Sequence, residues 1–332
     1  MKIMFASLGA YGHLYPMMPL ALACADAGHE TVIATGPPFL GQLPLPTVPG
    51  YPPDLELDWA IQETRSRHPD LHDQDFSMAM FADVTAELAA PTMIEQCERV
   101  RPDLVIYEGM HTGAGAAASV SGIPAAAYAI ALGSSVYGRL HAATVRYQRE
   151  TWLQWNRTPL EGDGLLATAL INPAPPSVRQ TDGTGIPTIP IRSVAYNESS
   201  AGVPAWLDGP RTRPRVYLTL GTVSFGAVEV LSRAIAEIAP LDVDVLVTVG
   251  PEGNPAALGD VPENVHVERF VAQSAVLPLV DLIVHHGGTG TVLSALEVGL
   301  PQLLLPQGAD QFFNAEILTT TGAARALPND AQ

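Results

Sequence analysis

The sequence is poor in charged residues, and poorest in basic ones. Charged side chains make up 15% of the 332 residues, and 17 Lys and Arg stand against 34 Asp and Glu, which gives a formal net charge of -17. A field of this sign repels phosphate backbones and anionic lipid, so we expect no nucleic-acid partner. It still allows one small phosphorylated ligand, because backbone amides at a helix start supply local positive potential.

Cysteines and long apolar runs are scarce as well. The two cysteines, Cys24 and Cys97, cannot form a disulfide framework and are typical of reduced thiols. No signal peptide is expected, since Gly9, Gly12 and His13 interrupt the first apolar run early. No run approaches the roughly 18 apolar residues that a membrane span needs. We therefore expect a cytoplasmic protein without a membrane span.

The chain does have a globular composition, 47% hydrophobic, and enough length for two domains. Short apolar strands alternate with helical patterns, which is typical of a parallel α/β sheet. This pattern restarts after a proline-rich stretch from 173 to 214. We predict α/β architecture with two Rossmann-like domains, 1–195 and 196–332. The expected strands are 2–8, 29–36, 103–107, 123–130, 215–221, 243–250, 265–271, 282–288 and 301–307, the expected helices are 15–27, 76–100, 114–121, 228–239 and 288–298, and the expected loop is 37–58.

One segment combines a histidine, a glycine turn and a helix start. An apolar strand runs into His286, and Gly288, Gly290 and Thr291 then open a helix. The first amides of a helix are unpaired and its dipole favours an anion, while glycine lets a bulky anion come close. The pattern predicts a phosphate or diphosphate site. The alternative is a tight turn in which the glycines serve geometry alone.

Asp310 and Gln311 follow the next expected strand. Ligands of open α/β sheets bind at the carboxyl ends of the strands, so this pair is expected beside the phosphate site. A carboxylate and an amide at that position suit the hydroxyls of a sugar.

The N-terminal counterpart is the turn Gly12-His13-Leu14-Tyr15-Pro16, which follows the first strand. Histidine titrates near neutral pH and suits a general base that takes a proton from a hydroxyl. The alternative is a histidine that caps a helix.

Together these motifs resemble the nucleotide-sugar signature of the GT-B glycosyltransferases of natural-product pathways. These two-Rossmann-domain enzymes act on macrolide, glycopeptide and enediyne antibiotics and are related to plant secondary-product glycosyltransferases. The resemblance covers nearly the whole chain and implies two domains that face each other across a cleft. The matching positions are His286, the glycine turn, Gly299-Leu300-Pro301, Pro306-Gln307, Asp310-Gln311 and Asn314-Ala315.

The resemblance also implies roles for individual residues. The diphosphate is assigned to Gly221, Thr222, His286, Gly288, Gly290 and Thr291, with Asn314 as a further candidate. The nucleobase is assigned to Val271 and Gln273, and the sugar to Asp310 and Gln311. His13 is the expected catalytic base, oriented by Glu108 where many relatives carry Asp, and His111 either assists or lines the acceptor site. Since Glu is one methylene longer than Asp, the geometry of the pair is open at this point.

Ser294 departs from the family pattern. Relatives that use uridine donors carry a Glu at this position, which binds both ribose hydroxyls. A deoxyribose lacks the 2'-OH, so the change favours a thymidine diphosphate donor.

Two further groups have no single interpretation. The Asp and His residues of 70–75 are expected to form a solvated loop rather than a metal site. Met78, Met80 and Phe81 suit either an apolar acceptor wall or the core.

The resemblance thus implies an inverting, metal-independent glycosyltransferase of antibiotic biosynthesis. It moves a sugar from a dTDP- or UDP-sugar to a hydroxyl of an apolar aglycone, needs no other cofactor, and is compatible with a homodimer. Two alternatives stay open: a nucleotide-sugar epimerase on the same fold, and a non-catalytic nucleotide-sugar-binding partner. In the family further helices follow the signature, and we expect them to be absent after the final GAARALPNDAQ.

Overall fold

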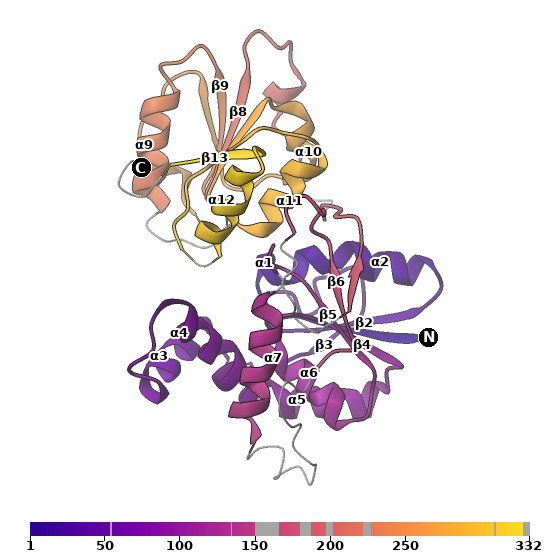
Figure 1. Ribbon diagram of the computed structural model, residues 1–332. Helices are drawn as coiled ribbons and strands as arrows, with labels where there is room; N and C mark the ends of the chain where they lie inside the picture. The colour runs from indigo at the N-terminus through magenta and orange to yellow at the C-terminus, as the bar shows by residue number, and fades with distance from the viewer. Residues whose placement is uncertain are drawn as a thin grey trace. The chain divides into compact units, whose positions relative to one another are not determined.

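The computed structural model describes residues 1–53, 55–133, 135–149, 166–179, 187–196, 202–221, 227–251, 253–308 and 310–327. These residues divide into two compact units. One holds Met1–Ala174 and Arg179–Arg192, and the other holds Pro175–Val178 and Ser193–Gln332. The second division, after Arg192, lies next to the boundary predicted at residue 195. Each unit contains one parallel sheet with helices against it (Figure 1), so the predicted α/β class is confirmed.

The N-terminal unit is built on a parallel sheet. Within the described residues it has seven strands in the order β3-β2-β1-β4-β5-β6-β7. In register, Ala6 pairs with both Ala34 and Tyr107, so β1, β2 and β4 end level with one another. The loops that follow these strands therefore start at one edge of the sheet. The strands are β1 (Lys2–Ala6), β2 (Glu30–Thr35), β3 (Thr47–Pro49), β4 (Leu104–Glu108), β5 (Ala125–Tyr128), β6 (Ala169–Asn172) and β7 (Thr188–Pro190).

Helices cover both faces of this sheet. In Figure 1, α2 lies on one face and α5 and α6 lie on the other. The small residues of α6 allow close packing, since a Cβ on Gly113 would lie 2.9 Å from the Ala86 carbonyl oxygen. A Cβ on Gly115 would lie 2.7 Å from the Tyr107 ring. The helices are α1 (Tyr11–Leu14), η1 (Tyr15–Met17), α2 (Met18–Asp26), α3 (Leu57–Arg67), α4 (Asp73–Ala79), η2 (Met80–Thr85), α5 (Ala86–Val100), α6 (Thr112–Val120) and α7 (Ser135–Tyr147).

The structure differs from the sequence interpretation of this unit in two expected elements and adds one strand that had not been expected. The predicted loop 37–58 contains β3 and the start of α3, whose many polar side chains hide its helical period. The single helix predicted over 76–100 is α4 and α5 joined by η2, a π-helical turn. The proline-rich stretch from 173 contributes β7, which lies at the sheet edge, where a strand tolerates proline.

The C-terminal unit repeats the plan. Its described residues form a six-stranded parallel sheet in the order β10-β9-β8-β11-β12-β13. Tyr217 packs with Leu246 on one face, while Val216 and Leu218 pack with Val245 on the other. Because both faces of the sheet are buried, the sequences of its strands are nearly continuous apolar runs. The elements are β8 (Arg215–Thr219), β9 (Asp244–Thr248), β10 (Val265–Glu268), β11 (Leu282–His285), β12 (Gln302–Leu304), β13 (Ala324–Ala326), α9 (Ala227–Ile238), α10 (Gln273–Val276), α11 (Thr289–Glu297), α12 (Gln311–Thr320), η3 (Ala205–Asp208), η4 (Pro255–Leu258) and η5 (Leu277–Leu279).

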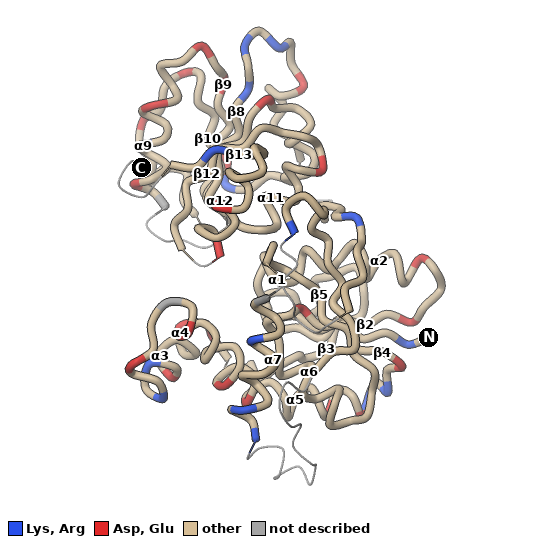
Figure 2. Tube along the Cα trace, viewed as in Figure 1, with Lys and Arg blue, Asp and Glu red and all other residues tan. Residues whose placement is uncertain are grey.

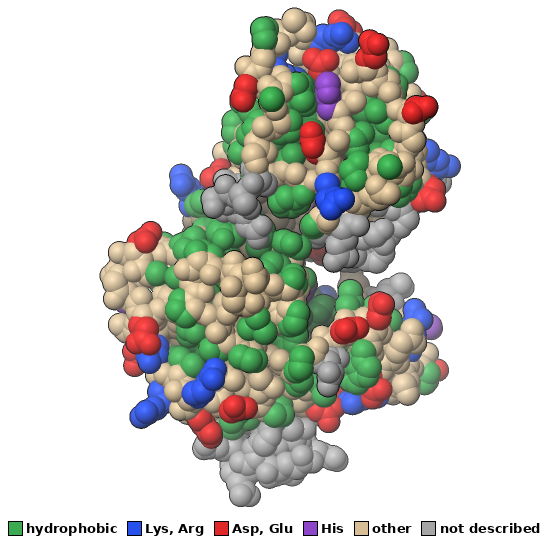
Figure 3. Space-filling model, turned by 180° about the vertical axis from the view of Figure 1, so that it is seen from behind, with side chains coloured by type: hydrophobic (Ala, Val, Ile, Leu, Met, Phe, Trp, Pro, Cys, Tyr) green, Lys and Arg blue, Asp and Glu red, His purple; other side chains and the backbone are tan. Residues whose placement is uncertain are grey.

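The surface reflects the sparse charge of the sequence. Figure 2 shows acidic and basic residues scattered over helices and loops of both units. Figure 3 shows apolar side chains reaching the surface between them. Among the described helices, none combines the length and the apolar character needed to cross a membrane.

Candidate active site

His13 and Glu108 come together because their strands are neighbours. His13 lies in α1, the first helix after β1, and Glu108 is the last residue of β4. His13 Nδ1 lies 2.9 Å from Glu108 Oε1, so the longer side chain of Glu reaches the ring. With Nδ1–H donated to the carboxylate, the neutral imidazole carries its lone pair on Nε2. The His13 side chain is 23% exposed, so this pair is accessible on the histidine side.

The Glu108 carboxylate is fully buried yet ionised. Burial alone would raise its pKa, but the charge and hydrogen bond of His13 and the hydrogen bond from the Met110 amide together lower the pKa below its ordinary value. The Met110 N–H donates to Oε2 at 2.8 Å. A buried negative charge beside an imidazole stabilises the protonated ring, as general base catalysis requires.

His111 is placed behind this pair. Its side chain is buried, with 2% exposure, and its ring donates to the Gly50 carbonyl. Burial lowers the pKa of His111 to about 4, with the nearby His13 adding to the effect and Glu108 and the Gly50 bond opposing it. Within the described residues its Nε2 has no hydrogen-bond partner. His111 is therefore neutral at pH 7 and buried close to Glu108.

The π-helical turn η2 brings an aromatic ring to His13. The ring centroids of Phe81 and His13 are 6.1 Å apart. The Phe81 carbonyl accepts hydrogen bonds from Thr85 Oγ1 at 3.0 Å and Thr112 Oγ1 at 3.2 Å, which fixes the turn. Met80 packs in a small core cluster that Phe81 also contacts, and Met78 packs against a second cluster. Of the predicted apolar wall, Phe81 is the member that the structure places beside the histidine.

In the C-terminal unit the carboxyl ends of β8, β11 and β12 are adjacent, and α11 starts there. Gly288 is the N-cap residue and makes no side-chain capping bond. The amides of Thr289, Gly290 and Thr291 follow in the first turn, where a helix leaves its N–H groups without intrahelical partners. This arrangement can bind a phosphate or diphosphate through backbone amides and the helix dipole.

The ring of His286 lies between two glycines of this loop region. A Cβ on Gly288 would lie 2.4 Å from His286 Nε2, and a Cβ on Gly221 would lie 2.6 Å from its Cε1. Gly221 also has φ +79, in the left-handed region that favours glycine. Burial lowers the pKa of His286 to about 4, so the ring is neutral at pH 7.

A hydrogen-bond network joins this loop to α12. Asp310 Oδ2 accepts from Thr289 Oγ1 at 2.8 Å and from Asn314 Nδ2 at 2.9 Å. Asn314 Nδ2 also reaches the Gly287 carbonyl at 2.9 Å and Thr289 Oγ1 at 3.0 Å. Asn314, expected on the phosphate side, is thus fully buried and braces the loop. The sequence interpretation missed Thr289, because its role is evident only from its hydrogen bond to Asp310, which lies 21 residues away.

Gln311 is turned inward. It is 6% exposed, and its Oε1 accepts from the amides of Gln307 at 2.7 Å and Gly308 at 3.1 Å. Its carbonyl oxygen therefore holds the loop before α12. Of the Gln311 side chain, only the amide NH2 group can still form the hydrogen bond to a sugar hydroxyl that was expected.

The nucleoside side of the predicted site lies around α10. Val271 is buried in a core cluster, so its backbone alone is suited to contact a base. Gln273 is the first residue of α10. Ser294 Oγ donates to the Gly290 carbonyl at 2.8 Å. A small hollow of about 120 Å³ is lined by Ala195, Ser274, Leu277, Ser294, Glu297 and Val298. Thr222 lies outside the described residues.

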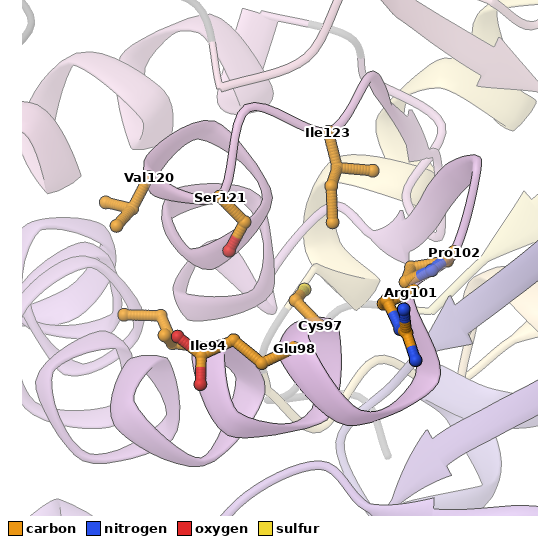
Figure 4. A pocket seen from close by; sticks show the side chains of 8 residues that line it. All are labelled: Ile94, Cys97, Glu98, Arg101, Pro102, Val120, Ser121 and Ile123. Carbon is orange, nitrogen blue, oxygen red and sulfur yellow. The ribbon is translucent and has the colours of Figure 1, made fainter.

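A larger hollow, of about 640 Å³, lies away from these residues. Figure 4 shows its lining side chains, which come from α5, α6 and the segments before β4 and β5. It therefore opens at the amino ends of the strands, opposite the edge that carries His13. Burial raises the pKa of Cys97 there to about 11, so the thiol stays protonated.

Within the described chain no cluster of three His, Cys, Asp or Glu residues is arranged to hold a metal ion.

Comparison with solved structures defines the class of protein. The glycosyltransferase SnogD from Streptomyces nogalater matches with a TM-score of 0.82 at 26% identity, over 100% of this chain and 87% of that one. Glycosyltransferase VinC in complex with dTDP matches with a TM-score of 0.78 at 27% identity, over 100% and 88%. The expected GT-B fold of two Rossmann-like domains is thus confirmed.

Sequence comparison gives the family. The model of the erythromycin biosynthesis protein CIII-like N-terminal domain matches residues 22–221, and that of its C-terminal domain matches 232–332. L-demethylnoviosyl transferase of Streptomyces niveus is 35% identical over 99% of this chain and 86% of that protein. TDP-daunosamine transferase DnrS of Streptomyces peucetius is 30% identical over 99% and 85%. The chain belongs to the erythromycin biosynthesis protein CIII-like family, which supports glycosyltransferase activity in antibiotic biosynthesis.

Proposed function

We propose that the protein transfers a deoxysugar from a dTDP-sugar to a hydroxyl of an apolar natural-product acceptor, with inversion at the anomeric carbon. The observation that carries this proposal is the 2.9 Å contact between His13 Nδ1 and the fully buried carboxylate of Glu108. A protein that only bound nucleotide sugars would have no need of such a pair. An epimerase would need no base for an acceptor hydroxyl.

The N-terminal unit supplies the base. His13 Nε2 takes the proton of the acceptor hydroxyl while its oxygen forms a bond to the anomeric carbon. Glu108 holds the ring by Nδ1 and stabilises the imidazolium that results. The bond from the anomeric carbon to the diphosphate oxygen breaks in the same step, so its electron pair leaves with the nucleotide. A single displacement of this kind inverts the anomeric centre.

The C-terminal unit stabilises the leaving group. The diphosphate gains negative charge as the bond breaks, and the amides of Thr289, Gly290 and Thr291 with the α11 dipole favour that charge. His286, neutral and held between Gly221 and Gly288, adds a hydrogen bond. Asp310, braced by Thr289 and Asn314, accepts hydrogen bonds from sugar hydroxyls. We expect this charge stabilisation to suffice without an added metal ion, which activity in the presence of a chelator would test.

The thymidine donor is supported by three observations. Ser294 replaces the ribose-binding Glu of uridine-dependent relatives. One relative is a TDP-daunosamine transferase, and the structural neighbour VinC was solved with dTDP. A thermal-shift screen of dTDP, UDP and GDP tests the nucleobase before any acceptor is known.

The substitution His13→Ala tests the mechanism. Transfer should fall to background while the affinity for dTDP, measured by calorimetry, stays within about two-fold, since the amides of α11 are untouched. Retained turnover would contradict the proposal. Release of free nucleotide without acceptor would instead favour the epimerase, and nucleotide-sugar binding without any turnover would favour the non-catalytic partner.

A further inference from the structure

Two tyrosine hydroxyls hold the two ends of the segment that carries His13. The Gly9 N–H donates to the Tyr51 hydroxyl oxygen at 2.8 Å. The Tyr128 hydroxyl donates to the Pro16 carbonyl oxygen at 2.6 Å. Both tyrosines are buried, with 7% and 3% exposure. One hydroxyl thus accepts from the backbone before His13, and the other donates to the backbone after it.

The two tyrosines come from strands on either side of β1. Tyr51 follows β3 and Tyr128 ends β5, and each of these strands is two places from β1 in the order β3-β2-β1-β4-β5. Both side chains therefore cross the carboxyl edge toward the loop after β1. In register, Tyr128 also pairs with Glu108, so this tyrosine is the neighbour, on the adjacent strand, of the residue whose carboxylate contacts His13.

The sequence leaves space for the Tyr51 ring. A Cβ on Gly36, just after β2, would lie 2.2 Å from the Tyr51 ring and hydroxyl, and a Cβ on Gly9 would lie 2.3 Å from that hydroxyl. Neither glycine has a positive φ. The missing side chain of Gly36 therefore leaves room for Tyr51 at the end of β2, whereas that of Gly9 leaves room for both the Tyr51 hydroxyl and the Pro37 carbonyl oxygen, which would lie 2.4 Å from such a Cβ.

Tyr51 is also tied to the loop of Glu108. Its ring makes an edge contact with His111, with centroids 6.4 Å apart. The His111 ring donates to the carbonyl of Gly50, the neighbour of Tyr51, and the His111 amide donates to the Glu108 carbonyl at 2.8 Å. The ends of β1, β3 and β4 are thereby joined around one histidine-carboxylate pair.

The two tyrosine hydrogen bonds hold a segment that has little stability of its own. The helix α1 has four residues, no side-chain cap at its start, and glycine at position 12. A helix this short has little stability of its own. Hydrogen bonds at both ends would keep the imidazole at its distance from Glu108, and misplacement of a catalytic group by about 1 Å can cost 10²-fold in rate.

We propose that Tyr51 and Tyr128 form a tyrosine clamp and are positioning residues that hold His13 against Glu108. The catalytic consequence rests on the proposed function, whereas the placement of the ring does not. The test therefore begins with a signal that needs no substrate. A histidine Nδ1 proton bonded to a carboxylate gives a far-downfield NMR resonance, and Glu108→Gln and His13→Ala assign it by its loss.

The variants are Tyr51→Phe, Tyr128→Phe and the double substitution, each removing a hydroxyl and keeping the ring. The clamp predicts a weakened, exchange-broadened resonance in each single variant and its loss in the double variant. Tyr107→Phe is the matched control, because this fully buried phenol bonds the His141 side chain at 2.9 Å instead of the His13 segment. An unchanged resonance in the folded double variant overturns the clamp.

Kinetics separate this inference from the proposed function. If the wild type transfers sugar, each single variant should lose about ten-fold in kcat with the dTDP affinity unchanged. If no acceptor is ever glycosylated, the proposed function fails while the NMR result still decides the clamp. Should the double variant not fold, Tyr51→Phe decides through the resonance and through the Gly9 amide, which must exchange faster with solvent than in the wild type. Unchanged exchange overturns the clamp.

Discussion

Each unit places a histidine just beyond the end of a central strand, yet the two histidines have opposite surroundings. His13 meets a buried carboxylate that fixes its tautomer and favours its protonation. His286 lies between Gly221 and Gly288, and burial keeps it neutral. The neighbours, rather than the position on the sheet, thus decide which histidine can exchange a proton. The first suits acid-base work, and the second suits a hydrogen bond to an anion.

Removing the Glu108 carboxylate should have the largest effect on the difference between His13 and His286. Glu108→Gln keeps the shape of the side chain but loses the charge and the preference for the Nδ1–H tautomer of His13. We expect kcat to fall about 10³-fold, within the range known for general base catalysis and its orienting carboxylates. Steady-state rates with saturating donor measure it, and dTDP affinity should stay unchanged. A fall below ten-fold would mean that Glu108 does not orient the base.

The buried neutral histidines should make both units lose stability in acid. The pKa of His141 is lowered to about 4, and that of His285 to about 3, mainly by burial. Unfolded histidine binds its proton near pH 6.5. The unfolded state therefore holds more protons below that pH, and stability falls as the pH drops from 6.5 toward 4.

The expected slope is at most about 1.4 kcal/mol per pH unit for each such histidine. Urea unfolding between pH 7.5 and 4.5 measures it, resolved by unit if two transitions separate. His141→Gln should reduce the slope of the N-terminal unit and leave that of the C-terminal unit. Equal slopes before and after the substitution would contradict the assignment. Because the folded pKa of Glu108 is lowered, the N-terminal unit should lose further stability once the pH falls below the ordinary Glu value.

The substitution Gly288→Ala tests whether the position of His286 matters for nucleotide binding. The added Cβ of Gly288→Ala would lie 2.4 Å from His286 Nε2, so the ring or the loop must move. Crowding of this kind costs about 1–3 kcal/mol, and we expect dTDP affinity to fall about ten-fold or more. Gly290→Ala is the matched comparison, because a Cβ there meets nothing within 4 Å in the protein. An equal loss in calorimetric affinity for Gly290→Ala would locate the effect at the bound nucleotide instead of His286.

The smallest effect is expected at Ser294. Ser294→Glu restores the carboxylate of uridine-dependent relatives next to the small hollow of α10 and α11. It should raise the affinity for UDP relative to dTDP by a few-fold, since only uridine diphosphate carries a ribose 2'-OH for the new acceptor. Calorimetric titration of both nucleotides gives the ratio, with Ser294→Gln as an uncharged control. An unchanged ratio of the UDP and dTDP affinities would mean that Ser294 does not favour a thymidine donor.

The sequence carried the position of most candidate site residues but not their orientation. His286, the glycines and Asp310 stand at fixed offsets around strand ends, and the strand order brings them together. Gln311 shares those offsets, yet its carbonyl turns to the amides of Gln307 and Gly308. An offset fixes the backbone position, whereas the rotamer depends on neighbours that fold in from elsewhere.

Other features leave no local pattern at all. Tyr51 acts 42 residues from Gly9, and Tyr128 acts 112 residues from Pro16, so nothing near either tyrosine marks its partner. The π-helical turn was missed for a related reason, because one additional residue in a long apolar helix barely disturbs its period. The edge strand β7 was hidden by prolines that normally indicate a loop.

The π-helical turn has a consequence for how the surface next to His13 can change. It joins α5, which is anchored in the core, to α4, and it holds Phe81 against His13. Each residue of a regular helix turns the chain by about 100°. Deleting a single residue between Met80 and Thr85 would convert the turn to ordinary α-helix and rotate α4 by that angle, while α5 kept its register. Short insertions and deletions in this turn would therefore change the surface next to His13 more than point substitutions would.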